Sequence, residues 1–459
     1  MTMPHITQQP PVHAAVPAAH ASVPAFLSGG DFTYRWDPAP VFVRAEGIRL
    51  HDDQGRVYLD AEAANGTAGL GFDAALATEA ARRVAAVPTL PSFCESALRL
   101  RVSRRLADRF EAATGAAGRV AFELGGAQGM ELAMRIVAAN RGNGPVVTFQ
   151  GSYHGRSPYT AQLSADARYR ELLGSGSLDV VRLPYPDCRR CPHRTASGCN
   201  PACAESAIRP GRESVTGVPA AGSPVPLAAF ILEPLLNVGG MALPDSDHLR
   251  RLVDHFRSLG ALIVVDEIFT GMYRTGPEWG FQLHGIEPDI IVASKGLTNG
   301  LSAFSCVWAR EPLAAPDVFP PGTHSSTYAA NPWSLAVVDT VLDRYEAWDD
   351  REGAVRALSA RLTSMAEALA ADHPVIAAVQ VVGAVARLEL SGPYAPQLRA
   401  IATDRAATGK PGLLLASTGM AKDVLALHPP LITTEAELAL IHEGLDEVLR
   451  TFASRTPAA

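Results

Sequence analysis

The chain has 459 residues and a net charge of −7, and 47% of its residues are hydrophobic while 19% are charged. This composition supports a large globular core and is not typical of general disorder. The mildly acidic charge argues against nucleic acid or an anionic membrane surface as the main partner, because both attract basic faces. No apolar run approaches about 18 residues, so we expect no transmembrane span.

Residues 1–25 are rich in Ala, Pro and His, and we expect a flexible tail there. They lack the basic start and the apolar block that are typical of a secretion signal, so we expect a cytoplasmic protein. In a reducing compartment, disulfides are not the expected state of the six cysteines.

The first regular structure is a predicted hairpin, in which the turn sequence Asp52–Arg56 separates two short apolar strands. Helical patterns follow over residues 74–86 and 96–114. From residue 119 onward strands alternate with helices, which is typical of a mostly parallel sheet with helices on both faces. The predicted strands are 119–123, 146–149, 227–233, 262–266 and 289–293, and further helices are predicted at 245–259, 334–348 and 435–453.

Two of these strands end in side chains that suit one site. The apolar run Leu262–Val265 leads into Asp266, and the apolar strand 289–293 is soon followed by Lys295. Open α/β sheets bind ligands at the carboxyl ends of their strands. We therefore interpret Asp266 as the partner of a pyridinium nitrogen and Lys295 as a Schiff-base lysine. Taken singly, Asp266 also fits a capped strand end, and Lys295 also fits a surface lysine.

Other strand ends carry candidate binding groups. The turn Gly125–Gly129 exposes backbone N–H groups that suit an anion, although a tight turn without a ligand has the same pattern. Tyr153 and His154 follow the next strand, where an aromatic ring either stacks on a flat ligand or is an ordinary loop residue. Glu233 either supports Asp266 or contacts the substrate, or it only caps or solvates the end of its own strand.

Four of the cysteines are close together in the sequence, with the spacing C-x₂-C-x₇-C-x₃-C. They are Cys188, Cys191, Cys199 and Cys203. Four thiolates with this spacing are able to hold zinc or an iron–sulfur cluster, and the alternative is a set of free thiols or disulfides on a surface loop. A metal there would be structural, because the cluster lies outside the catalytic motifs.

Together these motifs resemble those of the class III (ornithine/4-aminobutyrate type) aminotransferases. The resemblance runs from about Tyr34 to the C-terminus, and it is specific for the family but not for a substrate. It implies a fold type I enzyme that uses pyridoxal 5′-phosphate (PLP) to move an amino group between an amine or amino acid and an oxo acid or aldehyde. The segments that carry it are Phe122–Arg135, Gly151–Arg156, Ile231–Pro234, Val265–Gly276, Ser294–Gly296, His324–Pro332 and His428–Leu431.

The resemblance also implies roles for single residues. Gly126 and Ala127 would bind the cofactor phosphate through backbone N–H groups, and Tyr153 would stack on the pyridine ring. Asp266 would keep the ring nitrogen protonated, because an adjacent anion favours the cation. Lys295 would form the Schiff base and move a proton between the substrate Cα and the cofactor.

Three further residues complete the implied cofactor site. His154 and Glu233 would lie beside the cofactor, and Thr327 would reach the phosphate that the partner subunit binds. The resemblance therefore implies a homodimer with shared active sites and small-molecule amines or amino acids as substrates. We expect no nucleic-acid or membrane partner.

The implied fold class is α/β. A large PLP-binding domain, residues 76–330, would hold a mostly parallel, seven-stranded-type sheet flanked by helices. A small α/β domain would be formed by both chain ends, residues 26–75 and 331–459. We expect residues 184–226 to be a Cys-rich and Gly/Pro-rich insert in the large domain.

Three positions depart from the family pattern. Gly125–Gly129 replaces the usual Ser-Gly-x-Glu-Ala and loses a side-chain hydroxyl, and Phe269 replaces a Gln that usually lies near the cofactor's phenolic oxygen. Ala426 replaces an Arg that grips the α-carboxylate of glutamate, and Ala has no group for this task. Either His428 or an Arg elsewhere compensates, or the chain uses another amino donor. The alternative function is decarboxylation, epimerisation or carbon–carbon bond formation on the same scaffold.

Overall fold

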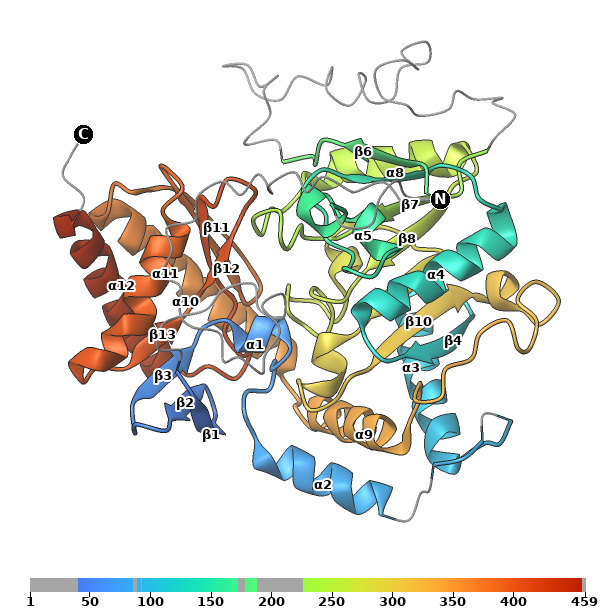
Figure 1. The fold of residues 1–459 in the computed structure, drawn as a ribbon, viewed down its shortest axis with the longest axis horizontal. Helices are drawn as coiled ribbons and strands as arrows, with labels where there is room; N and C mark the ends of the chain where they lie inside the picture. The colour runs from blue at the N-terminus through green and yellow to red at the C-terminus, as the bar shows by residue number, and fades with distance from the viewer. Residues whose placement is uncertain (1–39, 86–88, 92, 172–177, 188–225, 456–459) are drawn as a thin grey trace, which may run out of the picture.

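The computed structural model describes residues 40–85, 89–91, 93–171, 178–187 and 226–455. The largest sheet has seven strands in the order β4-β10-β9-β8-β7-β5-β6 (Figure 1). From β9 through β8, β7 and β5 to β6 the paired strands are parallel, whereas β10 runs antiparallel between β9 and β4. The predicted mostly parallel sheet is therefore confirmed. The strands are β4 (Gly118–Glu123), β5 (Val146–Phe149), β6 (Val180–Leu183), β7 (Ala229–Leu232), β8 (Leu262–Asp266), β9 (Ile290–Ala293) and β10 (Ser305–Arg310).

Helices cover both faces of this sheet. Successive residues of a strand point to opposite faces, so the side chains of the central strands pack against helices on both sides. Ile231 of β7 belongs to the same buried cluster as Met130 of α4. Its neighbour Phe230 packs on the other face, where its ring lies 4.7 Å from that of Phe256 of α8. The helices of this part are α2 (Ala74–Val84), α3 (Ala97–Thr114), α4 (Gly126–Arg141), α5 (Thr160–Leu163), α8 (Ser246–Ser258) and α9 (Pro332–Glu346).

The helix starts follow from local capping. The Ser96 side chain accepts a hydrogen bond from the backbone N–H of Arg99 at the start of α3, and the Asp245 side chain does the same for His248 at the start of α8. Such side chains satisfy N–H groups that the first helical turn leaves unpaired. The helices predicted at 96–114 and 245–259 are confirmed within one or two residues at each end.

Of the two smaller sheets, one combines strands from both ends of the chain, and the other contains C-terminal strands alone. One has the order β1-β2-β3-β13 and includes the predicted hairpin, and β13 pairs in parallel with β3. The other has the order β11-β12-β15-β14. In Figure 1 the blue strands β1 to β3 lie beside the orange and red C-terminal elements. The remaining elements are β1 (Phe42–Glu46), β2 (Arg49–Asp52), β3 (Val57–Asp60), α1 (Ala63–Gly66), α10 (Arg351–Asp372), β11 (Ile376–Val382), β12 (Val385–Leu390), α11 (Ala395–Asp404), β13 (Gly412–Leu414), β14 (Ala416–Thr418), β15 (Val424–Leu427) and α12 (Glu435–Arg455).

Some sequence predictions concern residues outside the described ranges. These are the tail at residues 1–25, most of the insert at 184–226, and the cluster of four cysteines. Within the described ranges, no helix is both long enough and apolar enough to cross a membrane.

Candidate active site

The two residues that the sequence singles out lie at one edge of the seven-stranded sheet. Asp266 is the last residue of β8 and stands opposite Val292 of β9 in a parallel pair. Lys295 follows β9 by two residues and begins a short 3₁₀ turn. Its backbone φ is +37°, which is uncommon for a residue with a side chain. The predicted proximity of the two strand ends is confirmed, because β8 and β9 are direct neighbours.

The Asp266 carboxylate is held in place on both of its oxygens. Oδ2 lies 2.8 Å from Nδ1 of His154, and Oδ1 accepts a hydrogen bond of 3.0 Å from the backbone N–H of Ile268. Nε2 of His154 in turn lies 3.2 Å from the Thr148 hydroxyl. Asp266 and His154 are both buried. The structure thus places His154 against Asp266, in a position to orient it.

Glu233 holds a loop and makes no hydrogen bond to Asp266. Its Oε1 accepts from the backbone N–H of Tyr153 at 2.9 Å, and its Oε2 accepts from that of Asn237 at 3.1 Å. Burial raises the pKa of Glu233 to about 7, and the nearby Asp266 acts in the same direction. The contact with Asn237 agrees with the strand-end cap predicted from the sequence, and the contact with Tyr153 adds a role that was not predicted, in which Glu233 positions the loop that carries Tyr153.

The start of α4 lies close to the end of β8. A Cβ atom at Gly126 would approach Cδ1 of Ile268 to 2.8 Å, so a larger residue here would require the Ile268 side chain to shift. The N-cap residue Gly125 provides no side-chain hydrogen bond, so the first N–H groups of this 16-residue helix, including those of Gly126 and Ala127, have no cap of that kind. Free N–H groups at a helix N-terminus suit an anion such as a phosphate.

The Lys295 amine lies among several charged groups. Burial lowers the pKa of Lys295, whereas the nearby carboxyls of Asp266, Glu233 and Glu62 oppose this shift. Arg274 is also close enough to lower the pKa further. These opposing effects suit an amine that must exist in both protonation states during a reaction.

Two of the three positions that depart from the family pattern lie together. Phe269 and Ala426 belong to a small buried cluster in which every member is apolar. The cluster joins the loops after β7 and β8 to the strands β12 and β15. Its buried members are Leu235, Met241, Phe269, Val385, Val424 and Ala426. Directly opposite Ala426 on β12 lies the buried Arg387, whose guanidinium pairs with Glu389 at 3.0 Å, so a cationic side chain adjoins this apolar cluster.

His428 does not compensate for the missing arginine in any direct way. Its ring is buried and stands edge-on to Phe269, with ring centres 5.2 Å apart. Burial and the nearby cations Arg274 and Lys295 hold the pKa of His428 well below its usual range, so the ring is neutral near pH 7. Arg274 is also buried, and its Nη1 donates to the backbone carbonyls of His428 and Pro429.

Sequence reasoning did not assign a role to Arg156, although this residue ends the segment Gly151–Arg156. Its guanidinium is exposed and lies 4.6 Å from the ring centre of Tyr169 and 5.8 Å from that of Tyr153. Among the described residues, no carboxylate forms an ion pair with it. Its position in the sequence could have indicated a role in the site, since Arg156 lies three residues after Tyr153, the predicted stacking residue.

The structure does not bring Thr327 into this group. It lies in the segment between β10 and α9, and its side chain is exposed, as is that of the adjacent Tyr328. The described ranges contain no group of three or more His, Cys, Asp or Glu side chains arranged to hold a metal, and the four clustered cysteines lie outside these ranges.

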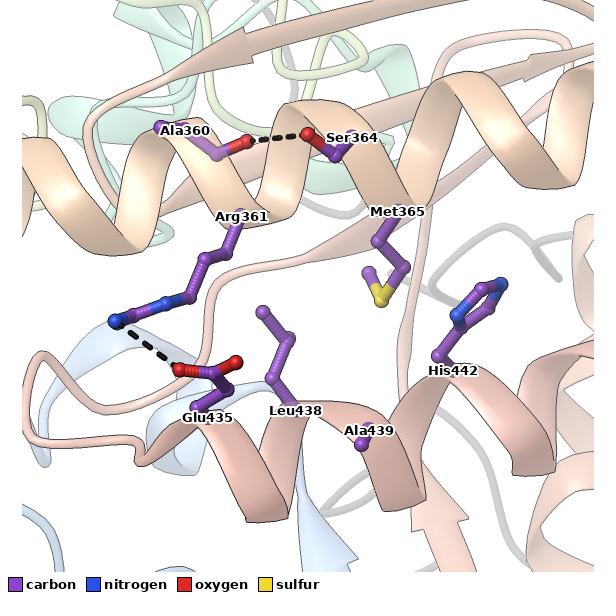
Figure 2. A pocket seen from close by; sticks show the side chains of 8 residues that line it. All are labelled: Ala360, Arg361, Ser364, Met365, Glu435, Leu438, Ala439 and His442. Carbon is purple, nitrogen blue, oxygen red and sulfur yellow. Dashed lines mark hydrogen bonds and ion pairs between the residues drawn. The ribbon is translucent and has the colours of Figure 1, made fainter.

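A groove of about 390 Å³ lies on the surface between α10 and α12 (Figure 2). Its one ion pair joins Arg361 to Glu435 at 3.4 Å. The remaining lining residues are Ala360, Ser364, Met365, Leu438, Ala439 and His442. None of the predicted site residues lines this groove, so we assign the chemistry to the sheet edge.

Comparisons with known proteins agree with the sequence motifs. Residues 34–449 match the sequence model of the family Aminotransferase class-III. An acetylornithine aminotransferase from Thermosynechococcus vestitus is 30% identical over 448 residues, which cover 96% of this chain and 100% of that protein. A diaminobutyrate–2-oxoglutarate aminotransferase from Rhizobium meliloti is 28% identical, over 87% of this chain and 86% of that protein.

Solved structures show the same fold. An amine transaminase from an uncultivated Pseudomonas species, determined in a PLP-bound form, superposes with a TM-score of 0.81 at 23% identity, over 94% of this chain and 99% of that one. The ornithine aminotransferase of Toxoplasma gondii superposes with a TM-score of 0.76 at 21% identity, and the match covers 91% of each chain. The expectation of a fold type I architecture is confirmed.

Proposed function

Because the chain belongs to the class-III aminotransferase family, we propose that its reaction takes place at the sheet edge shared by Asp266 and Lys295. The chain is an aminotransferase that depends on PLP. The observation that supports the location is the parallel pairing of β8 with β9, which puts a buried carboxylate and a lysine at adjacent strand ends. This location is where open α/β sheets bind ligands.

The residues at this edge fit the chemistry of PLP. A cofactor with a phosphate, a basic ring nitrogen and an aldehyde needs an anion site, a carboxylate and an amine. The free N–H groups at Gly126 and Ala127 would hold the phosphate, Asp266 would hold the ring nitrogen, and Tyr153 would cover the ring. When bound, the cofactor supplies an electron sink for the substrate Cα.

Each side chain then has a physical task. His154 keeps Asp266 oriented, and Glu233 keeps the loop of Tyr153 in place. Lys295 would bind the cofactor covalently, and after its release it would take a proton from the substrate Cα and return it. The opposing influences on the pKa of Lys295 support both halves of this transfer.

For the substrate, we propose an amine or amino acid whose carboxylate, if it has one, is bound by Arg156. This guanidinium is exposed, is framed by two tyrosine rings and has no carboxylate partner among the described residues. Ala426 has no group that binds a carboxylate, and the buried Arg387 opposite it already pairs with Glu389 at 3.0 Å, so we do not expect glutamate as the donor. The relatives named for acetylornithine and diaminobutyrate suggest amino acids with a second amino function as first candidates.

The test of this function is amino-group transfer from a panel of amines and amino acids to oxo acids, followed by detection of both products. Lys295→Ala is expected to lower the turnover about 100- to 10,000-fold, because it removes the general base. Lys410→Ala, which changes an exposed lysine that pairs with Glu447 at the surface, is the matched control and is expected to keep the wild-type rate. Wild-type turnover by Lys295→Ala would refute the role of Lys295. Release of carbon dioxide or an epimer without amino transfer would favour the alternative chemistry.

We also propose a cytoplasmic homodimer with shared active sites. Thr327 is exposed in the single chain, and large apolar side chains are exposed at Phe93, Leu100 and Tyr328. A second copy that covers these side chains would explain their exposure. Sedimentation should give twice the chain mass, and Thr327→Ala should weaken cofactor binding if Thr327 reaches the partner's phosphate.

The four cysteines Cys188, Cys191, Cys199 and Cys203 form a separate proposal, a structural site for zinc or an iron–sulfur cluster. The spacing of the four thiols in the sequence supports it. Metal analysis of protein purified without oxygen tests it, with a Cys191→Ala, Cys199→Ala double variant as the control. If wild-type protein contains neither zinc nor iron, the proposal is wrong.

A further inference from the structure

The amine of Lys295 lies over an aromatic ring. Its Nζ lies over the ring of Phe269, 5.2 Å from the ring centre. In the described part of the chain, this Nζ has no hydrogen bond or ion pair with a side chain, and the acids Asp266, Glu233 and Glu62 act on it only through their field. A cation within about 6 Å of an aromatic face is attracted by the negative potential of that face. The Phe269 ring is therefore placed to act directly on this amine.

The Phe269 ring itself is fixed from three sides. A Cβ atom at Gly66 would lie 2.6 Å from its Cε2, so the glycine leaves the space that the ring fills. His428 stands edge-on to it, with an interplanar angle of 88°. The apolar cluster that includes Val424 and Ala426 packs around the remaining side. With an exposed fraction of 5%, the ring has little freedom to move away from Lys295.

We propose that Phe269 is a positioning residue for Lys295, which holds the protonated amine over its face at the sheet edge and raises the amine's basicity. The importance of Lys295 for the reaction rests on the proposed function, but the contact and its test do not require the cofactor. The positive charge of Arg274 lowers the pKa of Lys295 and so opposes the effect of the ring. The three acids raise this pKa, as the ring does. A polar residue at position 269 would hold the amine by a hydrogen bond. The Phe269 ring instead attracts the protonated amine through the negative potential of its face.

The sequence makes a direct test practical, because the chain contains only three lysines, Lys295, Lys410 and Lys422. Lys410 pairs with Glu447 at the surface and Lys422 lies in a turn, so both serve as internal references. The full-length chain, freed of cofactor, is pulsed with acetic anhydride over a pH series. Mass spectrometry then gives the extent of acetylation at each lysine. The midpoint of the pH curve reports the pKa of the amine, and the plateau at high pH reports access.

Phe269→Leu keeps an apolar side chain but removes the aromatic face, and Phe269→Tyr keeps the face. We expect Phe269→Leu to lower the Lys295 midpoint by about half a unit to one unit, which is about three- to tenfold faster labelling at pH 7. Phe269→Tyr should keep the wild-type midpoint. Phe256→Leu, which removes a buried ring of α8 that packs on Phe230, controls for general loosening of the core and should also leave the midpoint unchanged.

The inference is overturned if Phe269→Leu leaves the Lys295 midpoint unchanged or raises it, because the ring would then only occupy space beside the amine. It is also overturned if Phe256→Leu shifts the midpoint as much as Phe269→Leu does. Unchanged curves at Lys410 and Lys422 show that the labelling conditions are the same for each variant. A failure of amino transfer in the wild-type enzyme would instead count against the proposed function, and it would leave these labelling results intact.

Discussion

Nδ1 of His154 lies 2.8 Å from Oδ2 of Asp266, and both side chains are buried at the edge of the main sheet. A carboxylate at a strand end has two oxygens that rotate together, and each one here has its own partner. The second partner is the backbone N–H of Ile268. His154 therefore determines which way Asp266 faces, since the backbone contact alone leaves the other oxygen without support.

We predict that His154→Phe lowers kcat/KM for amino transfer about 100-fold, because a small misplacement of a group at the reacting centre is costly. The free energy of unfolding should fall by about 1–3 kcal/mol, because Phe keeps the buried volume but leaves one oxygen of the Asp266 carboxylate without its partner. Steady-state kinetics and thermal melting measure the two effects. Thr148→Val removes the hydroxyl next to Nε2 but leaves the contact with Asp266, and it should cost much less activity. Equal losses in both variants would contradict an orienting role that is specific to Asp266.

The main sheet and its two end groups were predictable from the sequence. The run Leu262–Val265 is buried on both faces, and a continuous apolar strand that ends in Asp266 is the signal for this geometry. Lys295 was predictable for the same reason. The antiparallel strand β10, which lies between β9 and β4, was not, because its order in the sheet depends on pairing between distant segments.

Contacts that depend on packing between loops were also beyond the sequence pattern. His154 and Asp266 are 112 positions apart, and neither the apolar period nor a turn signal predicts that their side chains touch. Phe269 was recognised as an unusual residue, but its contact with Gly66 depends on how two loops pack. Such contacts arise from the tertiary fold, so a single sequence gives residue types but not partners.

The exposed guanidinium of Arg156 leads to a prediction about substrate choice. Arg156→Met should lower kcat/KM for an amino acid about 10- to 100-fold, because a charge-assisted bond to the carboxylate is lost. For an otherwise identical amine without the carboxylate, the same variant should keep nearly the wild-type kcat/KM. Arg156→Lys should restore little, since lysine does not present a planar pair of donors between the two tyrosine rings. The ratio of kcat/KM for the two substrates is the measurement.

A control is available in Arg104, an exposed arginine that pairs with Asp108 on α3. Arg104→Met should leave the substrate ratio unchanged. If Arg156→Met slows both substrates by the same factor, Arg156 supports the structure of the loop and does not bind a carboxylate.

The fit between Gly66 and Phe269 predicts a coupling between two substitutions. Gly66 has a φ of +80° and lies against the ring, so Gly66→Ala has both backbone strain and a steric clash. We expect a loss of about 1–3 kcal/mol in the free energy of unfolding. In the Phe269→Leu background the loss should be smaller by about 1 kcal/mol, because the clash is relieved while the strain remains.

Gly55 provides the matched control for this cycle. Its φ is +77°, but a Cβ atom there would meet nothing within 4 Å. Gly55→Ala therefore measures the strain alone, and its cost should not depend on residue 269. Denaturant unfolding of the four variants and the control measures the coupling. Full additivity of Gly66→Ala with Phe269→Leu would show that the ring does not need the glycine.

Glu267, the neighbour of Asp266, predicts how stability depends on pH. This buried carboxyl accepts hydrogen bonds from the Thr270 hydroxyl at 2.6 Å and from the backbone N–H groups of Gly280 and Phe281 at 2.9 and 2.7 Å. Burial raises the pKa of Glu267 to about 7, and the three donors only partly oppose the shift. The folded protein therefore binds a proton at this carboxyl more tightly than the unfolded chain, in which the pKa is near 4.5.

The sign of the effect follows from this difference. Between pH 4.5 and about 7 the folded state holds more protons at Glu267, so the stability contributed by this carboxyl is complete below pH 4.5 and is lost as the pH rises toward 7. Glu267→Gln does not titrate. The wild type should therefore lose stability relative to Glu267→Gln across this window, by up to about 3 kcal/mol. Urea unfolding of both proteins at several pH values gives the difference, and Glu435→Gln, a change at an exposed carboxyl, should show none. Parallel curves for wild type and Glu267→Gln would mean that the three donors keep the carboxyl ionised in the folded protein.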